Sequence, residues 1–205
     1  MPAGLENLGN TCYMNSVMQC LKRVNELRAA LKSMPAPTDQ NAYDPNTMLT
    51  LAGGQTMKGL EAREDYFVPR SFVQMLRTAH PVFDEVEERS GAHKQQDADE
   101  ALVAILGSFR GPLQRANEER EDVVGDLFEV ELETTHTNKE DPTEVSSMRE
   151  NVLKLTCQIE NGPASANTLQ EGLKISLQGD IEKDSQHLGR NAIWSKVSKI
   201  NRLVS

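Results

Sequence analysis

The feature that most constrains the fold of this chain is a change in the spacing of its apolar residues near residue 126. Before this point apolar residues recur at three- and four-residue intervals, as over residues 102–109, which predicts helices with one buried face. After it, residues 128–133 alternate between apolar residues and glutamate, which predicts a strand with one buried face. The sequence therefore predicts an α+β chain that is helical over residues 1–125 and rich in antiparallel strands over residues 126–205.

Two segments of the helical part have contrasting patterns. Residues 12–32 carry apolar residues at helical spacing throughout, which predicts one long amphipathic helix. Residues 35–59 are rich in Pro, Gly, Asn and Thr, and the pair Gly53-Gly54 is expected to break any helix that begins before it. We therefore expect that a helix begun within residues 48–51 does not continue through Gly53-Gly54.

The strand-rich part contains a second alternation of apolar and polar residues over residues 153–159, in which Cys157 belongs to the apolar set. The two alternations suggest an antiparallel pair of strands, with Cys157 in the core. Within residues 169–177 a short helix is expected to pass into a strand, and residues 192–200 predict a further strand.

Composition narrows the classes of function. The chain of 205 residues has 31 acidic and 22 basic residues and a formal charge of −9, which argues against a nucleic-acid surface and suits a basic partner. Its three cysteines form no CxxC pair and its four histidines are scattered, so neither a metal nor another cofactor is expected. No run approaches the roughly 20 apolar residues of a membrane span. We expect a protein of the cytoplasm, the nucleus or both, with no membrane partner.

A lone cysteine stands where a loop turns into a helix. Residues 4–15 read Gly-Leu-Glu-Asn-Leu-Gly-Asn-Thr-Cys-Tyr-Met-Asn, and Asn10 or Thr11 can cap the helix that follows. The first turn of a helix presents unpaired N–H groups and the positive end of the dipole, which favour a thiolate at Cys12. Cys12 is thus a candidate nucleophile. The alternative interpretation is a small buried cysteine at a helix start.

Residues 4–15, together with Gln19 and Cys20, resemble the Cys box of the ubiquitin-specific proteases. Residues 95–100, Gln-Gln-Asp-Ala-Asp-Glu, resemble the Gln-Gln-Asp box of the same family and follow at a compatible spacing. Taken alone, this hexapeptide indicates only that a helix begins at Gln96 or Asp97. The stretches that look like the proteasome-associated branch of the family are residues 126–135, 151–159 and 190–203.

The resemblance implies a papain-like fold, in which residues 1–125 form a helical thumb and residues 126–205 form a truncated set of finger and palm strands. It implies a thiol-dependent deubiquitinase that hydrolyses the bond after the C-terminal glycine of ubiquitin. Its implied partners are ubiquitin, ubiquitin conjugates and the proteasome. Cys12 is implied as the nucleophile and Asn7 as the donor to the oxyanion. The residues implied to bind the ubiquitin tail or shape its site are Asn10, Gln95, Gln96 and Asp97.

A cysteine protease of this kind also needs a histidine as general base. None of the four histidines, His80, His93, His136 and His187, lies in a segment that resembles the His box of the family. The sequence therefore predicts an incomplete catalytic domain, and the alternative to an active enzyme is an inactive ubiquitin- or proteasome-binding fragment. A third interpretation is an unrelated papain-like cysteine hydrolase or a redox protein. The absence of a CxxC pair and the presence of both motifs count against it.

Overall fold

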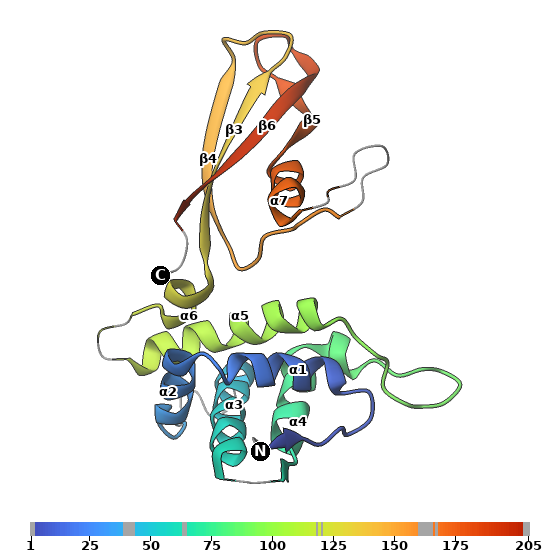
Figure 1. Ribbon diagram of the computed structural model, residues 1–205, viewed down its shortest axis with the longest axis vertical. Helices are drawn as coiled ribbons and strands as arrows, with labels where there is room; N and C mark the ends of the chain where they lie inside the picture. The colour runs from blue at the N-terminus through green and yellow to red at the C-terminus, as the bar shows by residue number, and fades with distance from the viewer. Residues whose placement is uncertain are drawn as a thin grey trace. The chain divides into compact units, whose positions relative to one another are not determined.

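A computed structural model describes residues 3–38, 44–62, 65–117, 119, 121–159, 166 and 168–202. The chain divides into two compact units, residues 1–127 and residues 128–205, which are described separately below. The first unit is helical apart from one short strand pair, and the second is built on an antiparallel sheet (Figure 1). The predicted α+β class is confirmed.

The first unit contains two short strands and a set of helices. Strands β1 (Gly4–Leu5) and β2 (Tyr66–Phe67) pair in parallel and so fix the N-terminal segment. The helices are, in chain order, α1 (Cys12–Leu21), α2 (Asn25–Ser33), α3 (Pro45–Ala62), α4 (Arg70–Ala79), the 3₁₀ helix η1 (Pro81–Asp84), α5 (Ala98–Ala116) and α6 (Val123–Phe128).

Helix α3 is central to this unit, because it packs against α2, α4 and α5, while α1 packs against α5 (Figure 1). The buried faces of these helices meet in one apolar core, which supplies the main stabilisation of the unit. Its largest fully buried side chains are Met14, Met18, Leu27, Leu31, Leu49, Met57, Leu60, Phe72, Leu76, Phe83, Ile105 and Phe109.

The prediction of one helix over residues 12–32 is wrong, because the chain turns between α1 and α2. The amides of Arg23 and Val24 donate to carbonyls in the last turn of α1, and α2 then begins at Asn25. The Arg28 guanidinium donates to the Lys22 carbonyl at 3.2 Å and satisfies it at the end of α1. Both helices bury an apolar stripe of the same spacing, so the pattern of apolar residues does not reveal the turn between them.

The expected helix break at Gly53-Gly54 is also wrong, because α3 runs through both residues; residues 39–43 of this segment lie outside the described part. Gly53 and Gly54 lie inside α3 and are buried. A Cβ atom on Gly54 would lie 2.2 Å from the carbonyl oxygen of Leu31, and one on Gly53 would lie 2.8 Å from the Phe109 ring. Here the glycines do not break the helix. They allow α2 and α5 to approach it closely.

The second unit contains a four-stranded antiparallel sheet with strand order β4-β3-β6-β5. Helix α7 contacts β5 and β6 (Figure 1). The elements are β3 (Val130–Asn138), β4 (Val145–Val152), α7 (Leu169–Leu177), β5 (Gln178–Ser185) and β6 (Arg190–Arg202). The predicted strands over residues 128–133 and 192–200 are confirmed in β3 and β6. The helix that passes into a strand is confirmed in α7 and β5, although the strand begins at Gln178.

The predicted strand over residues 153–159 is wrong, because the partner of β3 is β4 and residues 153–159 pack against α7 instead. The Gln158 amide donates to the Gly172 carbonyl at 3.3 Å, and the Cys157 sulfur lies 3.8 Å from the Leu169 carbonyl oxygen. A Cβ atom on Gly172 would lie 2.4 Å from that sulfur. Cys157 is therefore half-buried beneath α7, not in the core of the sheet as expected.

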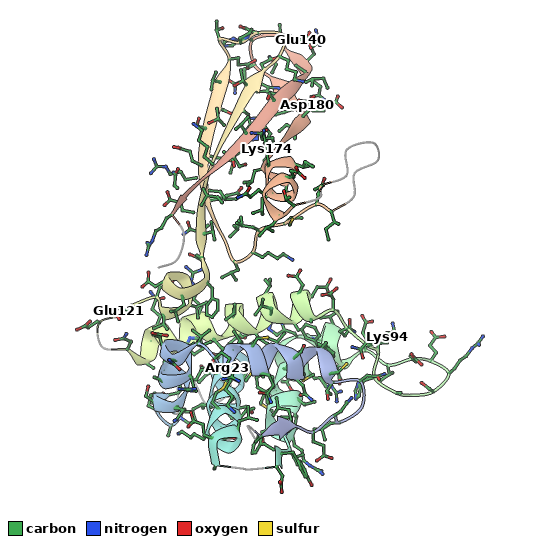
Figure 2. All side chains as sticks on the ribbon, viewed as in Figure 1. Arg23, Lys94, Glu121, Glu140, Lys174 and Asp180 are labelled. Carbon is green, nitrogen blue, oxygen red and sulfur yellow. The ribbon has the colours of Figure 1, made fainter. Side chains whose placement is uncertain are left out.

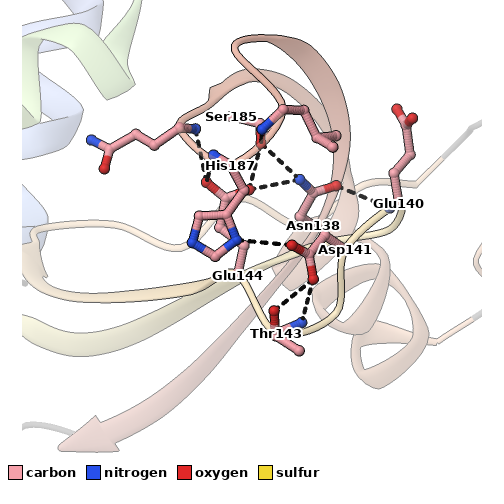
Figure 3. A network of polar contacts seen from close by, with 9 residues as sticks. Asn138, Glu140, Asp141, Thr143, Glu144, Ser185 and His187 are labelled. Atoms are coloured by element: carbon pink, nitrogen blue, oxygen red, sulfur yellow. Dashed lines mark hydrogen bonds and ion pairs between the residues drawn. The ribbon is translucent and has the colours of Figure 1, made fainter.

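Polar side chains join the two turns at one end of this sheet (Figure 3). Glu144 accepts hydrogen bonds from the Ser185 hydroxyl at 2.5 Å and from the Asn138 amide at 2.8 Å. The Gln186 backbone amide also donates to it, at 2.9 Å. Partial burial raises the pKa of Glu144, but these hydrogen bonds outweigh that effect and lower it to about 2. Glu144 thus ties the β3–β4 turn to the β5–β6 turn.

The same two turns are joined by an ion pair between Asp141 and His187, whose Oδ2 and Nδ1 atoms lie 2.8 Å apart. Hydrogen bonds from Thr143 and His187 lower the pKa of Asp141 to about 2, and the Asp141 carboxylate raises the pKa of His187. Glu140 lies at the same tip (Figure 2). Charged pairs thus supplement the backbone ladder where the sheet ends.

Candidate active site

The loop before α1 is organised by the side chain of Asn7. Its Oδ1 atom accepts hydrogen bonds of 3.1 Å from the backbone amides of Gly9 and Thr11 and from the Thr11 hydroxyl. Thr11, which is fully buried, accepts in turn from the Leu8 amide at 2.9 Å. Because three donors hold the amide oxygen, the orientation of the Asn7 side chain is fixed and its NH₂ group faces away from them.

Asn10 adopts a left-handed backbone conformation, with φ of 51°. Asparagine tolerates this conformation better than most residues other than glycine. The Nδ2 atom of Asn10 donates to the carbonyl oxygen of His93 at 2.8 Å. Asn10 was expected to shape the substrate site. The structure shows that it links residues 6–11, called the Cys12 loop below, to the segment that precedes α5.

Two amide side chains on α1 hold the N-terminal segment against this helix. Asn15 donates to the Glu6 carbonyl at 3.0 Å, and Gln19 donates to the Ala3 carbonyl at 3.1 Å. The sequence assigned no role to these two residues, and their only signal was that they are amide-bearing residues within the Cys12 motif. Thr11 was a candidate cap, and it stands at the N-cap position of α1 but makes no side-chain capping hydrogen bond.

Cys12 is the first residue of α1 and its side chain is exposed. The Nε2 atom of Gln95 lies 3.3 Å from the Cys12 sulfur, and the Oε1 atom lies 3.6 Å from it. The next residue, Tyr13, points into the core and stacks on Phe83 with ring centroids 5.7 Å apart. Burial raises the pKa of Tyr13, so its phenol stays neutral. The buried Tyr13 anchors the first turn that carries the exposed sulfur.

The other residues of the second motif face away from Cys12 or cap a helix. Gln96 donates to the Val82 carbonyl at 2.8 Å. Asp97 is the N-cap of α5, and its carboxylate accepts from the Asp99 amide at 2.6 Å. The predicted helix start is confirmed. Of the three residues expected to contact substrate here, the structure brings Gln95 alone to the cysteine.

The histidines of the first unit do not bond to Cys12: His80 has another partner, and the buried Nδ1 atom of His93 has no hydrogen-bond partner within the described part of the chain. The Nε2 atom of His80 lies 2.7 Å from the Ser108 hydroxyl, and burial lowers the pKa of its imidazole. The Nδ1 atom of His93 lies 3.8 Å from a carboxylate oxygen of Asp84. Among the residues that the structure describes, no histidine hydrogen-bonds to the Cys12 sulfur.

The described residues hold neither a metal-binding cluster nor a membrane-spanning helix. Over those ranges, no group of three or more His, Cys, Asp and Glu side chains gathers closely enough to hold a metal ion. Over the same ranges, no helix has both the length and the apolar character needed to cross a membrane.

Comparison with known proteins gives a consistent result. The family model described as ubiquitin carboxyl-terminal hydrolase matches residues 3–202. Ubiquitin carboxyl-terminal hydrolase 6 of Arabidopsis thaliana is 38% identical over 203 residues, which cover 98% of this chain and 41% of that protein. Hydrolase 6 of Schizosaccharomyces pombe is 30% identical over 202 residues, covering 98% of this chain and 40% of that protein. Hydrolase 14 of Caenorhabditis elegans is 30% identical over 204 residues, covering 98% of this chain and 39% of that protein. The chain thus spans about two fifths of the length of these curated relatives.

Proposed function

Because this chain belongs to the ubiquitin carboxyl-terminal hydrolase family, we propose that it carries the nucleophile of a thiol-dependent deubiquitinase. The reaction is hydrolysis of the bond after the C-terminal glycine of ubiquitin. One observation carries the proposal: the exposed Cys12 sulfur lies against Gln95, 83 residues away in the chain. Two motifs that are distant in sequence meet at a single reactive atom.

In the proposed reaction the Cys12 thiolate attacks the carbonyl carbon of the terminal glycine. A C–S bond forms and the carbonyl oxygen becomes an oxyanion. Its collapse breaks the C–N bond, the amine leaves with the proton that the thiol gave up, and a thioester remains. Water then hydrolyses the thioester to the free ubiquitin carboxylate and restores the thiol. The exposed position of Cys12 in the first turn of α1 supports this role, because a substrate carbonyl can reach its sulfur there.

Asn7 is the proposed donor to the oxyanion. Three hydrogen bonds to its Oδ1 atom fix the amide, so the NH₂ group is oriented before substrate arrives. A preoriented donor requires no reorganisation during the reaction, and removal of one such donor typically costs on the order of 10²–10³ in rate. This orientation supports the role that the resemblance implies for Asn7.

The start of α5 is the proposed contact for the ubiquitin tail. Asp97, Asp99 and Glu100 are exposed there, next to Gln95 and Gln96. Carboxylates at this position attract the basic side chains of an extended peptide. The acidic balance of the chain as a whole supports a basic partner of this kind.

A second candidate function is ubiquitin binding without catalysis. It is favoured by one observation, that no histidine among the described residues hydrogen-bonds to Cys12. For either function we propose ubiquitin conjugates as partners and the cytoplasm, the nucleus or both as location. The proposal of a proteasome partner rests on sequence resemblance alone.

The two candidates separate in a hydrolysis assay on ubiquitin that carries a fluorogenic amine on its C-terminal carboxylate. Deubiquitinase activity requires that the fluorophore is released by the wild-type chain, that Cys12→Ala abolishes release, and that Cys20→Ala retains it. Cys20 is a matched control, because it is an exposed cysteine on the same helix. Ubiquitin that binds in a titration without release supports the second candidate. A folded chain that neither binds nor hydrolyses ubiquitin refutes both.

A further inference from the structure

The Gln95 side chain presents both ends of its amide to the sulfur of Cys12, with Nε2 at 3.3 Å and Oε1 at 3.6 Å. The resemblance assigned Gln95 to the ubiquitin tail, but in the structure its amide is already committed to the cysteine. We propose that Gln95 is a positioning residue for the nucleophile, which holds the Cys12 sulfur and stabilises its thiolate form. This inference rests on the proposed role of Cys12 and deepens it.

A carboxamide suits this task because it carries a donor and an acceptor at neighbouring positions. The neutral thiol can donate its S–H to Oε1, and the thiolate can accept N–H from Nε2. A hydrogen bond to an ionised acceptor is stronger than one to a neutral acceptor, so the contact favours the thiolate. Gln95 therefore partners the sulfur in both protonation states and adds no charge. A primary amide does not take up a proton near neutral pH, so Gln95 does not replace the general base.

The chain on both sides of Gln95 is fixed by hydrogen bonds. Two residues before it, the His93 carbonyl accepts from Asn10, which belongs to the Cys12 loop. One residue before it, the Lys94 amide donates to the Glu85 carbonyl at 2.8 Å. Directly after it, Gln96 donates to the Val82 carbonyl. These contacts hold the Gln95 backbone near Cys12, which reduces the entropy lost when the amide meets the sulfur.

The side chains of Cys12 and Gln95 are both exposed, so the contact is not imposed by packing around them. It arises from the link between the Cys12 loop and the segment before α5. Substitution at Gln95 is therefore expected to change the chemistry of the sulfur while the core of the first unit stays intact.

The test is the rate at which iodoacetamide alkylates each cysteine at pH 7, followed by peptide mapping. Gln95→Glu keeps the shape but places a carboxylate beside the sulfur, which opposes the thiolate. Coulomb repulsion at this distance in a solvent-exposed setting predicts alkylation of Cys12 that is slower by about three- to tenfold. Gln95→Leu removes the donor without adding charge and is expected to give a smaller decrease. Cys20 and Cys157 serve as internal references, whose rates are expected to stay constant.

Gln74→Glu is the matched control for net charge, because Gln74 is an exposed glutamine on a different helix, α4. Its Cys12 rate is expected to equal that of the wild type. The inference is overturned if Gln95→Leu leaves the Cys12 rate unchanged, or if Gln74→Glu slows it as much as Gln95→Glu. The readout needs no ubiquitin, so the two proposals can fail separately. Alkylation that depends on Gln95 without ubiquitin hydrolysis refutes the proposed function alone, and hydrolysis with alkylation indifferent to Gln95 refutes this inference alone.

Discussion

Replacement of Gly54 by alanine would place a methyl group against the backbone of a neighbouring helix. The added Cβ would lie 2.2 Å from the Leu31 carbonyl oxygen, which belongs to α2, and 3.1 Å from its carbonyl carbon. This is roughly 1 Å inside ordinary contact, and no flexible side chain is there to move aside. The helices α2 and α3 must separate, or their backbones must distort, to accommodate the methyl group.

The size of the effect follows from two opposed contributions. Alanine is favoured over glycine within a helix by about 1 kcal/mol. Overpacking a tight contact costs about 1–3 kcal/mol, occasionally more, and a contact with backbone lies at the upper end. We therefore expect Gly54→Ala to lower the free energy of unfolding by about 1–2 kcal/mol, which lowers Tm by roughly 3–6 °C for a chain of this size.

Gly107→Ala is the matched control, because Gly107 is an exposed glycine inside α5 with nothing within 4 Å of its added Cβ. It receives the gain in helix propensity without the clash, so it is expected to raise stability by about 0.5–1 kcal/mol. Urea denaturation followed by circular dichroism at 222 nm compares both variants with the wild type. If Gly54→Ala proves as stable as Gly107→Ala, close packing of α2 on α3 is not the reason for this glycine.

Three further predictions concern the loop before α1 and the tip of the sheet. Asn7→Asp keeps the oxygen that binds the loop but loses the NH₂ donor, so the rate of ubiquitin hydrolysis should fall by about 10²–10³ with little change in Tm. Asn7→Ala should lower both the rate and Tm. Full activity in Asn7→Asp would exclude the role of Asn7 as donor to the oxyanion. Asn10→Gly removes the link to the Gln95 segment but permits the positive φ, whereas Asn10→Ala also strains the backbone. Both variants should slow Cys12 alkylation. The alanine variant should also be less stable than the glycine variant in urea by about 1–2 kcal/mol. Equal stabilities would show that the positive φ of residue 10 carries no strain. The ion pair between Asp141 and His187 needs an ionised carboxylate and a protonated imidazole. The pKa of Asp141 is lowered to about 2, so its contribution to stability is present above the ordinary carboxyl pKa and is lost as the pH falls toward 2. The pKa of His187 is raised, so its contribution to stability is present below the ordinary imidazole pKa and is lost as the pH rises through the raised value. His187→Ala should therefore destabilise the chain more at pH 5 than at pH 9 in thermal denaturation, and an equal loss at both pH values would contradict the pairing.

The sequence predicted features that depend on neighbouring residues. The helix that begins at Asp97 follows from a capping residue and an apolar stripe, and β3 follows from strict alternation. The place of Cys12 at a helix start likewise follows from the loop-forming residues before it. Each of these signals lies within one turn or strand of the feature that it predicts.

The features that the sequence does not predict depend on partners that are distant in the chain. In the sequence Gly54 indicates a helix break. In the structure it lies inside a helix, because the Leu31 carbonyl leaves no room for a side chain there. The alternation over residues 153–159 matches a strand, but its partner is α7 rather than the sheet. The contact of Gln95 with Cys12 depends on the hydrogen bond from Asn10 to His93, and no pattern of neighbouring residues predicts that hydrogen bond. Tertiary contacts decided each of these cases.

We propose that Cys12 is the nucleophile that reacts at the C-terminus of ubiquitin. The most direct measurement uses ubiquitin with a vinyl sulfone in place of its terminal carboxylate, followed by intact mass and peptide mapping of the adduct. We predict one adduct on Cys12, none on Cys20 or Cys157, and none at all in Cys12→Ala. A folded wild-type chain that forms no adduct, or forms it on Cys20 or Cys157, would contradict the claim.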